Sequence, residues 1–130
     1  MQKIYQELNL QNVKPEIIRQ IIQLSFLKVI RKDAIQANHQ MTPDTIGLIM
    51  AFLIEKVTKI KEIKTVFDPA VGTANLLTTV MNQLKVNGDK DIVGYGIDND
   101  EDMLEVASVS TELQHLNVKL YHQDAVTALD

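Results

Sequence analysis

The sequence predicts an α/β fold in which a helical amino-terminal segment precedes a parallel sheet. Residues 1–60 place apolar side chains at helical spacing, whereas residues 61–130 alternate short apolar runs with helical patterns. The order strand, helix, strand, helix, strand in that second part is typical of parallel strands joined by right-handed crossovers. We therefore expect two units, a helical segment over residues 1–60 and an α/β domain over residues 61–130.

The composition excludes several classes of site. The chain has 130 residues, of which 45% are hydrophobic and 23% charged, as in ordinary globular proteins. It has no cysteine, so disulfides, thiolate metal sites and cysteine nucleophiles are excluded. No apolar run approaches the roughly 18 residues that span a bilayer, and the start lacks the apolar core of a signal peptide. We expect a cytoplasmic protein without a membrane partner.

The first part predicts two helices. Ile17, Ile18, Ile21 and Ile22 follow helical spacing, and Pro15 suits a first turn, which predicts a helix near residues 14–37. A second helix is expected after Thr42-Pro43-Asp44, with Thr42 as its cap, Pro43 in its first position and Asp44 at the positive end of its dipole. Its predicted buried stripe consists of Ile46, Ile49, Met50, Leu53, Ile54 and Val57.

The second part predicts three strands and two helices. The strand candidates are residues 63–67, 91–97 and 118–122, because each is a short run rich in apolar or β-branched residues. Residues 75–86 and 101–113 have helical patterns, and Gly88 suits a left-handed cap after the first of them.

The turn after the first strand candidate contains an acid, a rigid proline and a glycine. In an open parallel sheet, ligands bind at the carboxyl ends of the strands, where the chain turns into the next helix. Asp68 is placed at that end, Pro69 stiffens the turn, and Gly72 lets a ligand approach the backbone. Free N–H groups of the following helix can receive an anionic group. A tight turn with an aspartate cap is the alternative interpretation.

Two further acids are predicted at the same edge. Asp98 ends the second strand candidate, and Asp124 follows the third. A carboxylate at the position of Asp98 is suited to two ribose hydroxyls, as in dinucleotide-binding folds. Any one of the three acids could be a helix cap, but the three together favour a binding site.

The charge changes sign along the chain. Residues 1–66 contain ten Lys and Arg against six Asp and Glu, whereas residues 67–130 contain three against eleven. This asymmetry suggests two functional halves. The alternative is that the charges only solvate two different faces.

Residues 68–77 resemble the first motif of the class I S-adenosylmethionine-dependent methyltransferases. The Asp-Pro-Ala-x-Gly form is most similar to the adenine-N6 DNA methyltransferases, and residues 39–44 resemble the Thr-Pro segment that precedes the first strand in that family. Asp98 and Asp124 fall where the second and third family motifs belong, so the resemblance covers roughly residues 38–126. It implies a Rossmann-like sheet whose first three parallel strands have the order 3-2-1.

The resemblance also implies a cofactor site for S-adenosylmethionine. Met41, Thr42 and Pro43 would lie against the methionine end, and Asp68 would orient the amino group. Backbone contacts would come from Ala70 to Gly72. Asp98 would hold the ribose, with Asn99 beside the adenine, while Asp124 would accept from the adenine amine, with Ala125 near the ring.

Two features depart from the family pattern. Ala74 stands where the family has its second glycine, so it is strained if that position requires a positive φ and harmless if it lies in the first helical turn. The catalytic [Asn/Asp/Ser]-Pro-Pro-[Tyr/Phe] element is absent, and the prolines are Pro15, Pro43 and Pro69. We therefore expect a fragment, inactive alone, of a longer DNA-binding methyltransferase whose catalytic residues lie beyond Asp130. The open edge of its first strand, over residues 63–67, would let the fragment self-associate.

Other interpretations have less support in the residues. A non-catalytic binding or regulatory module with the same fold is the main alternative, and Ala74 favours it. A nicotinamide-dependent dehydrogenase is disfavoured because Asp68-Pro69 replaces the Gly-x-Gly turn. Residues 98–109 begin like a calcium loop, but Met103 and Val109 replace its glycine and its last carboxylate. No metal is expected, since His39, His115 and His122 lack ligand spacing.

Overall fold

The computed structural model describes residues 14–33, 42–88 and 91–127. Its elements are α2 (Pro15–Asp33), α3 (Asp44–Val57), the short 3-10 helix η2 (Ile60–Glu62), β1 (Thr65–Asp68), α4 (Asn75–Asn87), β2 (Val93–Asp98), α5 (Glu101–Leu113) and β3 (Val118–His122). Every strand and helix predicted for residues 61–130 is present. No helix in these ranges is long and apolar enough to cross a membrane.

The three strands form one parallel sheet with β2 in the centre. The strand order is β1-β2-β3, which confirms the expected order 3-2-1. Phe67 of β1 pairs with Tyr95 of β2, and Tyr95 pairs with Lys119 of β3. Because all three strands run in the same direction, their carboxyl ends lie at one edge of the sheet.

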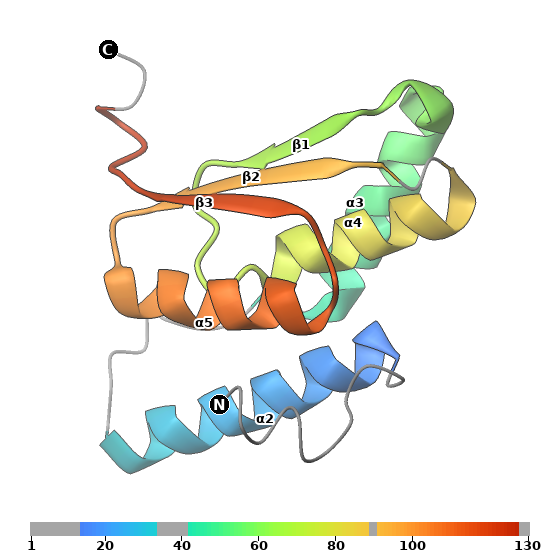
Figure 1. Cartoon of the computed structure of the whole chain (residues 1–130). Helices are drawn as coiled ribbons and strands as arrows, with labels where there is room; N and C mark the ends of the chain where they lie inside the picture. The colour runs from blue at the N-terminus through green and yellow to red at the C-terminus, as the bar shows by residue number, and fades with distance from the viewer. Residues whose placement is uncertain (1–13, 34–41, 89–90, 128–130) are drawn as a thin grey trace.

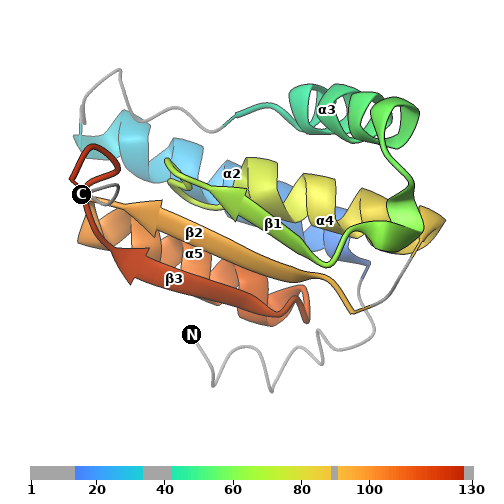
Figure 2. The same cartoon turned by 90° about the horizontal axis from the view of Figure 1, so that it is seen from above.

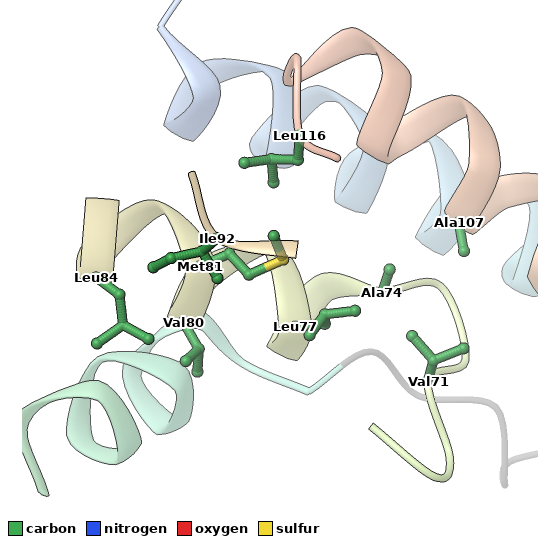
Figure 3. Close-up of a cluster of buried hydrophobic side chains, with 9 residues drawn as sticks. All are labelled: Val71, Ala74, Leu77, Val80, Met81, Leu84, Ile92, Ala107 and Leu116. Carbon is green, nitrogen blue, oxygen red and sulfur yellow. The ribbon is translucent and has the colours of Figure 1, made fainter. Parts of the chain in front are cut away.

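The helices cover one face of the sheet. Figure 1 shows α4 and α5 against this face and α2 beneath them in a further layer. No helix of the described ranges covers the opposite face. Figure 3 shows a cluster of buried hydrophobic side chains around α4, which forms the core. Its buried members are Val71, Ala74, Leu77, Val80, Met81, Leu84, Ile92, Ala107 and Leu116.

Helix α3 packs differently from the prediction. Its buried residues are Gly47 and Ala51, and a Cβ built on Gly47 would lie 2.6 Å from Thr79 Cγ2. Thr79 belongs to α4, so α3 approaches α4 closely at Gly47, where a side chain on α3 would not fit. The predicted buried stripe was wrong for all members except Ile54, which packs partly buried against the core. The exposed members are Ile46, Ile49, Met50, Leu53 and Val57.

The position of α3 explains this exposure. Seen from above in Figure 2, α3 lies beside α4 and beyond the β1 edge, so no described strand lies over it. The described residues therefore leave most of the large apolar side chains of α3 uncovered.

Two predicted helix caps were wrong. The residue before α3 is Pro43, in an extended conformation and without a side-chain cap hydrogen bond, so Thr42 lies one residue too early to cap the helix. Instead, the Thr42 carbonyl accepts a hydrogen bond from the side chain of Asn75. Gly88, which follows α4, has φ −151° and ψ −133°, so it is not in the left-handed conformation. The bounds of the first strand also differ slightly from the predicted residues 63–67, because β1 starts at Thr65 and includes Asp68.

Candidate functional site

The three predicted acids lie at the carboxyl edge of the sheet. Asp68 is the last residue of β1, and Asp98 is the last residue of β2. Asp98 pairs with His122, the last residue of β3, and Asp124 follows two residues later. Since these three acids come from adjacent strand ends, the structure brings them to the same edge.

Each acid also stabilises its own turn. Asp68 Oδ1 accepts from the Ala70 N–H at 3.0 Å, and Asp98 Oδ1 accepts from the Asp100 N–H at 2.9 Å. Asp124 Oδ1 accepts from the Val126 N–H at 2.8 Å. The interpretation of Asp68 as the cap of a tight turn is therefore correct. None of the three acids caps a described helix, because Ala74 precedes α4 and Asp100 caps α5. These contacts leave acceptor capacity on all three groups, because a carboxylate has about four lone-pair sites for donors.

Asp98 additionally ties the glycine turn to the sheet. Its Oδ2 accepts from the Gly72 N–H at 2.9 Å. The neighbouring Val71 N–H donates to the Ile97 carbonyl at 2.9 Å. These two bonds hold the turn that follows β1 against the end of β2. The turn is thereby ordered before any ligand arrives, which lowers the entropy cost of binding.

Gly72 leaves an opening beside this turn. Its φ is +51°, in the left-handed region that glycine occupies without strain. A Cβ built at this position meets no other atom within 4 Å. The backbone conformation, and not crowding by described neighbours, is what requires glycine here. The open space is therefore available to a ligand that approaches the backbone.

Ala74 has a positive φ, which is the strained one of the two conformations considered for it from the sequence. Its φ is +64°, and it immediately precedes Asn75, the first residue of α4. A left-handed alanine costs about 1 kcal/mol relative to glycine. Its side chain is fully buried in the core, with Leu77 and Ala107 in the same cluster (Figure 3). The methyl group thus packs in the protein interior, where its burial offsets much of the strain.

Burial raises the pKa of Asp68 above its ordinary value of 3.8. The hydrogen bond from the Ala70 N–H favours the charged form and opposes this shift, while the negative charge of Asp98 adds to it. The two carboxylates therefore place concentrated negative charge at the edge. A cationic group bound between them would relieve this repulsion.

His122 links the loop after β2 to the helix that follows. Its Nε2–H donates to the Asn99 carbonyl at 3.0 Å, and its Nδ1 lies 3.3 Å from Glu101 Oε1. Asp100 caps α5 through the N–H groups of Asp102 and Met103. The loop that carries Asn99 is thus held from both sides.

The remaining predicted residues take various positions. Thr42 precedes α3 next to Asn75, and Pro43 and Ala70 are exposed. Ala125 lies in the turn after β3 and is half-buried. Met41 lies outside the described residues. Among those that the structure describes, no three His, Asp or Glu side chains are grouped so that they could hold a metal ion.

The sequence analysis did not predict a polar cluster that lies next to the glycine turn, around Asn75. Asn75 and Asp44 lie at the starts of α4 and α3 and share hydrogen bonds with Gln23 of α2. Arg19 of α2 lies beside Asp44, with its Nε 3.6 Å from Asp44 Oδ2. These residues belong to three segments far apart in the sequence, so no spacing could indicate their contact.

Comparison with known protein families agrees with the geometry of this edge. The family described as N-6 DNA Methylase matches residues 26–129. The chain belongs to this family. The match includes the glycine turn and all three strand-end acids.

Individual relatives support the same assignment. A Listeria monocytogenes structure, provisionally described as a class I S-adenosylmethionine-dependent methyltransferase, is 48% identical, with a TM-score of 0.82 over 94% of this chain. The uncharacterized protein YtxK of Bacillus subtilis is 41% identical over 114 residues, which are 88% of this chain. A Geobacter sulfurreducens methyltransferase, 18% identical over 82% of this chain with a TM-score of 0.57, shares the fold.

The chain spans between about a third and a half of the length of these relatives. It covers 38% of the Listeria chain, 33% of YtxK and 51% of the Geobacter chain. The chain is therefore a methyltransferase-fold region of the N-6 DNA methylase family.

Proposed function

We propose that this region binds S-adenosylmethionine at the carboxyl edge of its sheet, and that the protein methylates adenine N6 in DNA. The observation that carries the proposal is the meeting of an ordered glycine turn, an opening at Gly72 and three strand-end carboxylates at one edge. Membership of the N-6 DNA methylase family supports the reaction.

The residues at this edge fit the chemistry of the cofactor. Asp68 would bind the ammonium of the methionine end, and Asp98 would accept from the ribose hydroxyls. The Ala70 to Gly72 backbone would approach the cofactor closely, because Gly72 carries no side chain into the open space. Asp124 would accept from the adenine amine, with Asn99 and Ala125 near the ring. Met41, Thr42 and Pro43 would lie against the methionine end.

The negative charges of Asp68 and Asp98 also favour the binding of a cationic cofactor. The bound cofactor supplies a methyl group on a positively charged sulfonium, and its ammonium is also cationic. Asp68 and Asp98 repel each other, which contributes to the raised pKa of Asp68. A cation near both would favour their charged forms. The role of the described residues is to bind and orient, which places the methyl group for an in-line attack.

Membership of the N-6 DNA methylase family supports DNA as the proposed substrate. The amino nitrogen of an adenine inside a duplex is out of reach, so enzymes that modify a base first turn it out of the stack. We assign no catalytic residue to the described ranges. A purely regulatory module remains the alternative function, and Ala74 does not favour it, because its methyl group packs in the core.

The proposal is tested by calorimetric titration with S-adenosylmethionine and S-adenosylhomocysteine. We expect binding by the wild type and at least tenfold weaker binding by Asp98→Asn, which loses charge-assisted hydrogen bonds. Asp100→Asn is the matched control, since asparagine is also a good helix cap and the change removes the adjacent negative charge. Melting curves followed by circular dichroism check that both variants fold.

The activity needs its own assay. The protein at the full length of its relatives should transfer tritiated methyl groups to unmethylated DNA, with the label on adenine N6. Absence of cofactor binding by the wild type would contradict the proposal. Binding without methyl transfer to DNA would contradict the assigned reaction and favour the regulatory alternative.

A further inference from the structure

The polar cluster next to the glycine turn centres on the side chain of Asn75. The residue is only 6% exposed. Its Nδ2 donates to the Thr42 carbonyl and, at 3.0 Å, to Asp44 Oδ1. Its Oδ1 accepts from Gln23 Nε2 at 3.0 Å. One amide thus joins the start of α4 to the start of α3 and to α2.

Asp44 is held in place by the same helix α2. Gln23 Nε2 donates to Asp44 Oδ1 at 2.7 Å, and Arg19 Nε lies 3.6 Å from Asp44 Oδ2. Arg19 is 4% exposed, and its Nη1 donates to Gln114 Oε1 at 3.3 Å. Its buried Nε has no hydrogen bond in the described part of the chain. A buried guanidinium needs a nearby negative charge, so the pair fixes Asp44 and α2 relative to each other.

The cluster lies where two proposed cofactor-binding segments meet. Asn75 directly follows the glycine turn, which contains Gly72 and the strained Ala74. Thr42 belongs to the Thr-Pro segment proposed for the methionine end. The two segments are about thirty residues apart in the chain, and the hydrogen bond from Asn75 to the Thr42 carbonyl joins them.

We propose that Asn75 is a positioning residue for the cofactor site, and that Gln23, Arg19 and Asp44 hold it in its working orientation. This inference rests on the proposed function, because it concerns the affinity of the same site. Loss of the Asn75 donors would let the Thr-Pro segment move relative to the glycine turn, although neither Asn75 nor α2 is proposed to touch the cofactor. The helical amino-terminal part would then tune cofactor affinity.

Asn82 provides a matched control on the same helix. It lies two turns after Asn75, and its Nδ2 donates to the Thr78 carbonyl and to Gln114 Oε1, both at 2.9 Å. Gln114 also contacts Arg19, so Asn82 belongs to the same network. Within the described ranges, its side chain forms no hydrogen bond with the Thr-Pro segment or the glycine turn. Removing it should perturb packing but leave the cofactor site in place.

The experiment compares Asn75→Ala and Asn82→Ala with the wild type. Circular dichroism gives the melting temperature, and calorimetric titration gives the affinity for S-adenosylmethionine. We expect both variants to melt at a lower temperature, because each leaves polar partners unsatisfied. Only Asn75→Ala should also bind about tenfold more weakly, the equivalent of one or two lost hydrogen bonds.

A second variant covers the case in which Asn75→Ala does not fold. Asn75→Asp keeps the size of the side chain, but its ionised form cannot donate and faces the Asp44 carboxylate. At neutral pH it should bind more weakly than the wild type. Between pH 7 and pH 5 its deficit relative to the wild type should shrink, because a protonated carboxyl can donate again.

The outcomes separate this inference from the proposed function. Wild-type affinity in Asn75→Asp at neutral pH would overturn the inference, as would equal losses of affinity in Asn75→Ala and Asn82→Ala. In both cases the cofactor proposal would stand, because the wild type binds. A wild type that binds no cofactor would overturn both proposals together.

Discussion

At the scale of single residues, Asp68 combines a cost in folding stability with the binding role that we propose for it. Burial and the charge of Asp98 raise its pKa, so the folded protein holds the Asp68 proton to a higher pH than the unfolded chain does. As pH rises from the ordinary value of 3.8 through the raised pKa, the folded state therefore loses stability through this group. Above that window the cost is fully present.

We predict that Asp68→Asn folds at least as stably as the wild type at pH 7 and binds the cofactor at least tenfold more weakly. The asparagine oxygen can still accept from the Ala70 N–H, whereas the charge that would bind an ammonium is gone. Thermal unfolding between pH 3.5 and 7 should show that the stability of the variant relative to the wild type increases as pH rises. A relative stability that instead decreases with rising pH would contradict the raised pKa of Asp68.

The location of a candidate site residue is predictable from the sequence where it depends only on the position of that residue along a strand. Asp68, Asp98 and Asp124 were placed at one edge by the strand pattern alone, and the structure has them there. The direction of the Ala74 methyl group was not predictable, because it depends on how α4 packs against its neighbours. The hydrogen bonds of Asn75 likewise join segments that are distant in the sequence, so they were not predictable either.

At the scale of elements, α3 shows what an amphipathic pattern leaves open. The pattern predicted a helix, and the helix is there, but it could not say which face is covered. The contact with α4 uses Gly47 and Ala51, because small residues allow the close approach of two backbones. The large apolar residues of α3 lie elsewhere on its surface. Which face a helix buries depends on its partners, and the sequence of the helix does not specify these.

We predict that Gly47→Ala destabilises the protein by about 1–3 kcal/mol despite the higher helix propensity of alanine. The new Cβ would lie 2.6 Å from Thr79 Cγ2 and 2.8 Å from Thr79 Cβ, so α3 would have to move away from α4. Urea unfolding measures the change. Thr45→Ala, at an exposed position of the same helix, should change stability by less than about 0.5 kcal/mol. Unchanged or increased stability in Gly47→Ala would show that α3 packs more loosely than described.

At the scale of the whole molecule, apolar surface and an unpaired strand occur on the same side. Among the described strands, β1 pairs with β2 alone, so its other edge has free backbone donors and acceptors. Phe67 of β1 is 58% exposed, and α3, which lies beyond this edge in Figure 2, exposes Ile49 and Leu53. An apolar surface of this kind is typical of an interaction site in a soluble protein.

We predict that the 130-residue chain self-associates through this surface. Burial of each large apolar side chain contributes roughly 1.5–3 kcal/mol, so a few of them on each copy can offset the entropy cost of association. Sedimentation velocity over a concentration series should show a growing share of dimers or larger species. The double variant Ile49→Glu/Leu53→Glu should shift this distribution to monomers, because association would then bury unpaired carboxylates. Val126→Glu changes an even more exposed apolar residue in the turn after β3 and should leave the distribution unchanged. A chain that is monomeric at every concentration, or a Val126→Glu variant that dissociates equally, would rule out this surface as the contact.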